Sequence, residues 1–161
     1  MSTVQTGRHT VAPNQSVTVF LIGMRFGKPW RVDKWLPVVT AMPRMLKHLE
    51  QTPENGLLGY HSYVGTTTLM LSYWRSPEHL NRFASAPDAP HLGPWRAYMH
   101  KLAKDPAVGI WHETYAITPG HYEVVYANMT PFGLGKALGT QPVGTGMRTA
   151  AQRMRASHAT A

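Results

Sequence analysis

Histidine is the residue type with the most evident chemistry in this chain of 161 residues, which contains nine histidines and no cysteine. Five of the histidines lie in or near segments with a regular pattern: His61, His79, His91, His100 and His112. Each could exchange a proton near neutral pH, and each could equally be a hydrogen-bonded structural residue. The absence of cysteine excludes thiol nucleophiles, disulfides, zinc–thiolate sites and iron–sulfur clusters.

The stretch GIWHETY, residues 109–115, places a histidine beside a glutamate in an apolar and aromatic setting typical of a strand. Side chains alternate along a strand, so His112 shares one face with Ile110 whereas Glu113 shares the other with Trp111. His112 and Glu113 therefore point apart, and they cannot form one catalytic pair.

The sequence also lacks the motifs of several catalytic classes. It contains no phosphate loop, no GxGxxG after a strand, no HExxH and no GxSxG. Of its eight acidic residues, Glu113 and Glu123 fall within predicted strands, which argues against a two-carboxylate hydrolase. We predict no metal site.

Aromatic residues are concentrated in the segments predicted to build and cover a sheet. They are Tyr60, Tyr63, Tyr73, Trp74, Trp95, Tyr98, Trp111 and Tyr115. Such side chains could line an apolar pocket for a planar organic ligand. They could also form an aromatic core that holds no ligand.

The elements that would position these residues follow from periodicity and turn signals. Strands are predicted over 16–26, 56–65, 66–76, 108–117 and 121–129, and helices over 33–51, 77–84 and 94–105. This order is typical of the α+β class, as a ferredoxin-like, split βαβ antiparallel sheet with its helices on one face. The second and fourth strands then lie at opposite edges, which puts His61 and His112 roughly 14 Å apart, too far for a dyad.

The first predicted strand is apolar on both faces. Val17, Val19 and Leu21 lie on one face, and Phe20 and Ile22 lie on the other. Helices cover only one face of such a sheet, so the other face needs a second cover. A second copy of the same sheet would supply it, and we therefore predict a homodimer.

The two ends of the chain differ in composition from its centre. Residues 1–13 predict a flexible N-terminal arm, 14–135 the folded domain, and 136–161 a basic, disordered tail. Half of the formal charge of +8 comes from this tail, while residues 14–130 hold eleven basic and eight acidic residues. This distribution does not favour a nucleic-acid partner. No signal peptide and no membrane-length apolar segment is evident, so we predict a cytoplasmic protein without membrane association.

Several stretches together resemble the fumagillin-type, antibiotic-biosynthesis-monooxygenase-like family. They are VFLIGMRFGKPWRVDKWLPV, AMPRML, LLGYHSYVG, YWRSPEHL, DAPHLGPWRAY, VGIWHETY and VVYANMTPFGLG, and they run from about residue 17 to 135. The resemblance implies a dimeric α/β barrel, in agreement with the predicted order of elements. It also implies two candidate activities, because this barrel is used by cofactor-independent oxygenases and by proteins that hold haem.

The oxygenase alternative implies a small aromatic or polyketide-like substrate between sheet and helices. His112 or His61 would remove a proton from it, and the resulting anion would reduce dioxygen with no cofactor required. Tyr60 and Arg25 would stabilise an oxyanion. The aromatic lining would come from Trp74, Trp95, Trp111 and Tyr63.

The haem alternative uses a histidine of the second helical region as the axial ligand of haem b. His91 or His100 would serve, with His112 or His61 on the distal side. A third alternative is a non-catalytic barrel that binds a small hydrophobic or aromatic molecule.

Overall fold

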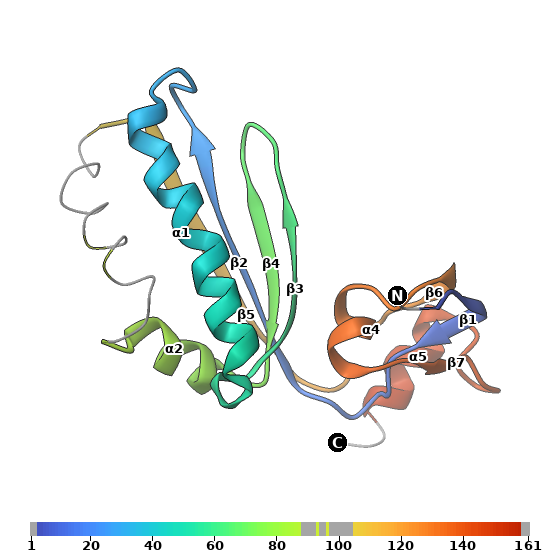
Figure 1. Ribbon diagram of the computed structural model, residues 1–161. Helices are drawn as coiled ribbons and strands as arrows, with labels where there is room; N and C mark the ends of the chain where they lie inside the picture. The colour runs from blue at the N-terminus through green and yellow to red at the C-terminus, as the bar shows by residue number, and fades with distance from the viewer. Residues whose placement is uncertain (1–2, 88–92, 94–95, 97–104, 159–161) are drawn as a thin grey trace.

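The computed structural model describes residues 3–87, 93, 96 and 105–158. The elements within them are β1 (Gln5–Thr10), β2 (Val17–Phe26), α1 (Val32–Gln51), the 3₁₀ turn η1 (Pro53–Asn55), β3 (Leu57–Tyr63), β4 (Leu69–Trp74), α2 (Pro77–Ser85), β5 (Val108–Ile117), β6 (Tyr126–Met129), α4 (Gly133–Leu138), β7 (Gln141–Pro142) and α5 (Ala150–His158). They form a larger lobe around β2–β5 and a smaller lobe around β1, β6 and β7 (Figure 1). Among these residues, no helix is both long and apolar enough to cross a bilayer.

The larger lobe contains an antiparallel four-stranded sheet in the order β3-β4-β2-β5. Helices α1 and α2 lie on one face of this sheet (Figure 1). This is the strand order of the ferredoxin-like arrangement, so the α+β fold class predicted from the sequence is confirmed. Strands β3 and β5, which carry His61 and His112, form its two edges as expected.

The helix-covered face of the sheet holds the main apolar core. Trp74 of β4 is 2% exposed and packs with Leu49 of α1 and with Leu80 and Phe83 of α2. Helix α2 reaches this position from a well-defined start, because the Ser76 hydroxyl accepts a hydrogen bond from the next turn of the helix. The core therefore ties both helices to the centre of the sheet.

The smaller lobe differs from the sequence-based prediction for the two ends of the chain. The segment predicted as a flexible arm contains β1, which pairs with β6 and β7, and the predicted disordered tail contains α4, β7 and α5. The predicted strand over 121–129 is shortened to β6, and it joins this second sheet rather than the main one. Strand β1 and helix α5 were missed because they are polar, so their sequences show no apolar periodicity. Helix α4 and strand β7 have six and two residues, too few for a periodic pattern.

The second face of the main sheet is only partly covered. At one end, Val17 and Tyr73 pack against Val11 and Leu134 of the smaller lobe. Elsewhere on this face Tyr63 is 45% and Tyr115 50% exposed. The two-sided apolar character of β2 is thus satisfied in part by the same chain, which the sequence did not predict.

Candidate functional site

The structure separates the predicted site residues onto the two faces of the sheet. The helix-covered face carries Tyr60, Trp74 and His112, as the contacts of these residues with α1, α2 or the core residue Phe20 show. The opposite face carries Arg25, His61, Tyr63 and Trp111. Side chains alternate between the two faces along a strand, and each of these four residues lies an odd number of positions from a residue of its own strand on the helix-covered face: Phe20 on β2, Tyr60 on β3 or His112 on β5. Trp95, His91 and His100 lie outside the described residues. One pocket between sheet and helices therefore cannot include both His61 and His112.

His112 and Trp74 differ in their surroundings although they share the helix-covered face. The His112 side chain is exposed, with its ring 5.9 Å from that of Phe20. Trp74 is buried, and its indole N–H donates to the Ser72 hydroxyl at 3.0 Å. Trp74 is therefore a core residue whose polar atom is already satisfied.

A pocket of about 190 Å³ lies along the β3 edge of the sheet. Its lining comes from the end of α1, from η1, from β3 and from α4: Leu49, Glu50, Pro53, Leu57, Leu58, Gly59, Tyr60 and Lys136. The lining combines an apolar floor with one carboxylate, one phenol and one ammonium group. Pockets of drug-sized ligands hold roughly 300–1,000 Å³, so this pocket suits a small molecule or part of a larger one.

The polar centre of this pocket is a hydrogen bond from the Tyr60 hydroxyl to Glu50 Oε1, 2.8 Å long. Glu50 raises the pKa of Tyr60 through this bond, and partial burial adds to the shift. The last turn of α1 is brought to β3 by the short connection through η1, which ends at Gly56 with φ of +84°. A Cβ atom at Gly56 would also lie 2.6 Å from the ring of His79, so this turn requires glycine.

Lys136 brings a positive charge to the pocket from the other lobe. It lies on α4, which packs beside β3. Burial and, next, the charge of Lys136 lower the pKa of His61. His61 and Lys136 are therefore close enough to interact, although His61 points away from the helices.

His61 itself is engaged by the smaller lobe. Its Nε2 atom accepts a hydrogen bond from the Gly133 backbone N–H at 3.0 Å, and its ring lies 4.1 Å from that of Phe132. The lone pair that a general base would use is thus already occupied in the described structure. This geometry makes His61 a contact between the two lobes.

Arg25 and Trp111 lie on the same open face but away from the pocket. Arg25 donates to the Thr67 hydroxyl at 3.4 Å, near the far end of β2. Trp111 packs over Gly23, and its indole N–H is buried without a hydrogen-bond acceptor within the described part of the chain. Neither residue contributes to the lining at the β3 edge.

Sequence reasoning missed Glu50 and Lys136 as pocket residues. Glu50 falls near the end of the helix predicted over 33–51, and no motif marks it. The short α1–β3 connection was the available signal, since it forces the end of α1 to lie beside β3. No sequence signal connects Lys136 to this edge, because the segment around it was predicted to be disordered.

Within the described residues, no three histidine, aspartate or glutamate side chains are grouped as they would be for a metal.

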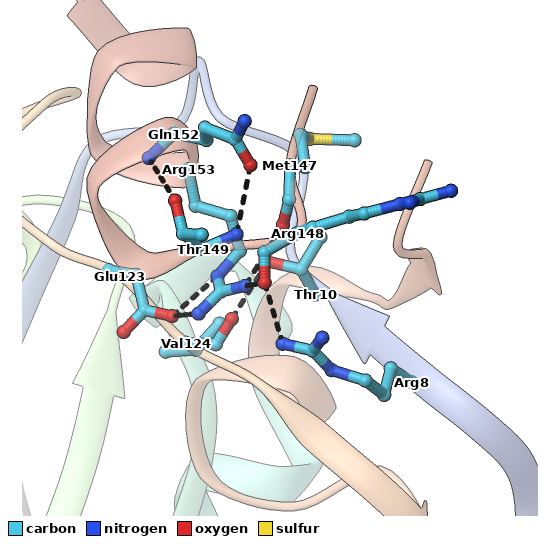
Figure 2. A network of polar contacts seen from close by, with 9 residues as sticks. All are labelled: Arg8, Thr10, Glu123, Val124, Met147, Arg148, Thr149, Gln152 and Arg153. Atoms are coloured by element: carbon cyan, nitrogen blue, oxygen red, sulfur yellow. Dashed lines mark hydrogen bonds and ion pairs between the residues drawn. The ribbon is translucent and has the colours of Figure 1, made fainter. Parts of the chain in front are cut away.

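A second polar cluster joins α5 to the small sheet (Figure 2). Arg153, 6% exposed, forms an ion pair with Glu123 and donates to the carbonyl oxygens of Met147 and Arg148. The Arg8 guanidinium donates to the same Arg148 carbonyl at 2.9 Å. The hollow beside this cluster holds about 10 Å³, roughly one water molecule. The cluster is therefore a closed structural contact without space for a ligand.

Comparison with known proteins finds a curated protein of similar sequence and a solved structure with a limited likeness. Monooxygenase af470 from Aspergillus fumigatus is 29% identical over 142 residues, which cover 81% of this chain and 50% of that protein. The chain thus spans about half the length of this curated relative. The crystal structure of protein SO0527 from Shewanella oneidensis aligns over 74% of this chain and 99% of that one, with 14% identity and a TM-score of 0.41. A likeness at this level supports no conclusion about function.

The profile of a protein family described as Monooxygenase af470-like matches residues 17–134. The match includes the whole main sheet, α1 and α2, and every residue of the pocket lining except Lys136, which lies just beyond it. The chain therefore belongs to the Monooxygenase af470-like family.

Proposed function

We propose that the protein is a monooxygenase that acts on a small aromatic or polyketide-like molecule in the pocket at the β3 edge. The family membership supports the reaction class, and the curated relative is named a monooxygenase. The observation that carries the choice of site is the Tyr60–Glu50 hydrogen bond in a mainly apolar lining that also includes Lys136. This pocket offers a proton acceptor, a proton relay and a cation within one small space.

The proposed substrate has a CH₂ group flanked by aromatic rings or carbonyl groups, because such a carbon can lose a proton and remain stable as an anion. Overall, R₂CH₂ and O₂ give R₂C=O and H₂O, so the substrate supplies all four electrons that reduce dioxygen. A C–H proton leaves first, and the carbanion forms a C–O bond with O₂ to give a peroxide. Loss of the second C–H proton then breaks the O–O bond, which yields the carbonyl and, with protons, water.

The pocket residues take distinct roles in this proposal. The carboxylate of Glu50 accepts the first proton, either directly or through the hydroxyl of Tyr60. The ammonium group of Lys136 stabilises the negative charge on the substrate oxygen, the role that the sequence had suggested for Arg25. His112 lies at the opposite edge of the sheet, roughly 14 Å away by strand spacing, and so takes no part at this site.

Oxygen uptake measured with a panel of compounds that carry a CH₂ group between aromatic rings or carbonyl groups, such as anthrones and 1,3-diketones, tests this function. We expect uptake with at least one compound and a decrease of about 10²-fold in Glu50→Gln, since general-base catalysis contributes about that much. Glu54→Gln is the matched control, because Glu54 is an exposed acid of η1 that does not line the pocket. Equal activity in both variants, or no uptake by the wild type, would sink the proposal.

Haem binding stays an alternative prediction. Its proposed axial ligands, His91 and His100, lie outside the described residues. An absorption spectrum of the purified protein decides the matter, because a bound haem gives a Soret band. A colourless protein that consumes oxygen would exclude the haem alternative.

We also propose that a second copy of the chain covers the open part of the main sheet. The uncovered aromatic side chains of Tyr63 and Tyr115 support this, together with the half-buried Leu21 and Leu71 beside them. Light scattering coupled to gel filtration should give twice the mass of the chain. A monomer at micromolar concentration would contradict it.

A further inference from the structure

His61 joins the two lobes through a hydrogen bond and a ring contact. Its Nε2 atom accepts the backbone N–H of Gly133, the first residue of α4, at 3.0 Å. Its ring packs on Phe132, with the ring centroids 4.1 Å apart. A ring nitrogen can accept only when it carries no proton, so the contact requires neutral His61 with its proton on Nδ1.

The charged and titratable groups around this contact come from four elements. Lys136 of α4 is the charged residue of the described chain that acts on the His61 ring, and it opposes a positive charge there. Tyr73 of β4 and Tyr126 of β6 have their hydroxyls near Gly133, and burial raises the pKa of both phenols. Tyr63 of β3 adds to the shift of Tyr73. The phenols Tyr73 and Tyr126 thus stay uncharged around neutral pH.

Protonation of His61 would reverse the polarity of this contact. Nε2 would become an N–H donor that faces the Gly133 N–H, so the hydrogen bond would be lost and two donors would oppose each other. The new positive charge would also lie near Lys136. The start of α4 would then lose its attachment to β3.

We propose that His61 is a pH-sensitive clamp, which as a neutral ring fixes the start of α4 on the edge of the sheet and on protonation releases it. Since α4 carries Lys136, the clamp also positions the ammonium group at the β3-edge pocket. His61 is in this sense a positioning residue and not a base. The effect on turnover depends on the function proposed above, whereas the clamp itself does not.

The direction of the pH dependence follows from the lowered pKa of His61. The folded state favours the neutral ring, so the contribution of the contact is complete above the unperturbed pKa of about 6.5. It is lost as the pH falls below that value towards the folded pKa. Acidification, not alkalinisation, should therefore release α4.

NMR titration of the full chain between pH 8 and pH 5 tests the clamp directly. In the wild type, we expect the Gly133 amide proton to shift upfield as its hydrogen bond is lost. The midpoint should equal that of the His61 ring carbons and lie below 6.5. A Gly133 amide that does not follow the His61 titration would overturn the proposal.

Two substitutions separate the acceptor from the ring. His61→Gln supplies a side-chain oxygen that can accept the Gly133 N–H but does not titrate, so the Gly133 amide should stay in its bound position throughout. His61→Phe keeps an aromatic ring against Phe132 but has no acceptor, so the amide should be in the released position at every pH. His112→Gln, at the other edge, should leave the wild-type titration unchanged. If the Gly133 amide proton still shifts with pH in either His61 variant as it does in the wild type, the clamp is contradicted.

Oxygen uptake then reports whether the clamp affects the site. If Lys136 contributes to turnover, the wild type should lose activity on the acidic side of the His61 midpoint, and His61→Gln should extend activity to lower pH. With no oxygenase activity in any form, the function proposed above fails while the NMR result still decides on the clamp. A clamp seen by NMR with identical activity profiles would overturn its positioning role.

Discussion

Two polar clusters of this protein use a glutamate in opposite ways. Glu123 in the smaller lobe is paired with Arg153, whose guanidinium also donates to two backbone carbonyls, and the adjacent hollow has room for about one water. Glu50 in the larger lobe accepts a hydrogen bond from Tyr60 in the lining of a pocket of about 190 Å³. The first cluster is closed around its own partners, whereas the second faces open space.

This difference indicates which cluster stabilises the fold and which can bind a ligand. Arg153 is 6% exposed, so its charge depends on Glu123 and on the carbonyl groups around it. Glu50 is exposed and can exchange its partner for a ligand with little cost to the fold. We therefore expect substitutions of Arg153 or Glu123 to change the stability of the fold, and substitutions of Glu50 or Tyr60 to change the chemistry of the pocket.

Removal of the Arg153 charge should have the largest effect. In Arg153→Met, the Glu123 carboxylate would lose its cation and the Met147 carbonyl would lose the Arg153 donor. The Arg148 carbonyl would keep the hydrogen bond from Arg8. Breaking one side of a buried pair costs about 3–5 kcal/mol, and we expect about 3 here because Glu123 is partly exposed. Urea unfolding, followed by circular dichroism, measures the decrease in the free energy of unfolding.

Two further variants show whether this loss comes from the ion pair. Arg155→Ala removes an exposed arginine of the same helix and should leave the unfolding midpoint within experimental error. Combining Arg153→Met with Glu123→Leu should recover part of the stability, since no unpaired charge remains. An Arg153→Met protein as stable as the wild type would show that the cluster does not hold the lobe.

The Tyr60–Glu50 pair should respond through its titration and not through the stability of the fold. Glu50 raises the pKa of Tyr60, so Glu50→Gln should bring that pKa down towards its usual value of about 10. The neutral phenol is favoured in the folded state, so the small stabilisation is complete below pH ~10 and is lost as the pH rises through the folded pKa. NMR of the Tyr60 ring measures the midpoint, and Glu54→Gln should leave it unchanged. Equal midpoints in Glu50→Gln and the wild type would mean that the hydrogen bond does not form in solution.

The same contrast explains what the sequence could predict. The order of strands and helices determined the main sheet, because apolar alternation and turn residues mark each element locally. The edge positions of His61 and His112, and the opposite directions of His112 and Glu113, followed from that order. The sequence also placed Tyr60 on a strand, and the structure has it on β3.

Local sequence patterns do not predict which residues these side chains contact, because the partners lie far away along the chain. His61 accepts from Gly133, which is 72 positions away along the chain, and Arg153 pairs with Glu123 across 30 positions. Both contacts depend on the smaller lobe, whose polar strands and helix carry no apolar pattern that would reveal them. Arg153 is a buried residue of α5, although arginine is mostly exposed in folded proteins. A search for apolar positions therefore does not identify this side of the helix as buried.

The smallest effect is expected at a second tyrosine–glutamate pair, which has the chemistry of the first without its pocket. Tyr115 donates to Glu113 at 2.7 Å on the open face of β5, and Tyr115 is 50% exposed. Tyr115→Phe removes only the hydroxyl and keeps the ring that a second copy of the chain would cover. We expect no measurable change in the unfolding midpoint, in the mass by light scattering or in oxygen uptake. A loss of activity in Tyr115→Phe as large as that in Glu50→Gln would place the chemistry on the open face of the sheet. The presence of a pocket beside a tyrosine–glutamate pair would then not indicate where the reaction takes place.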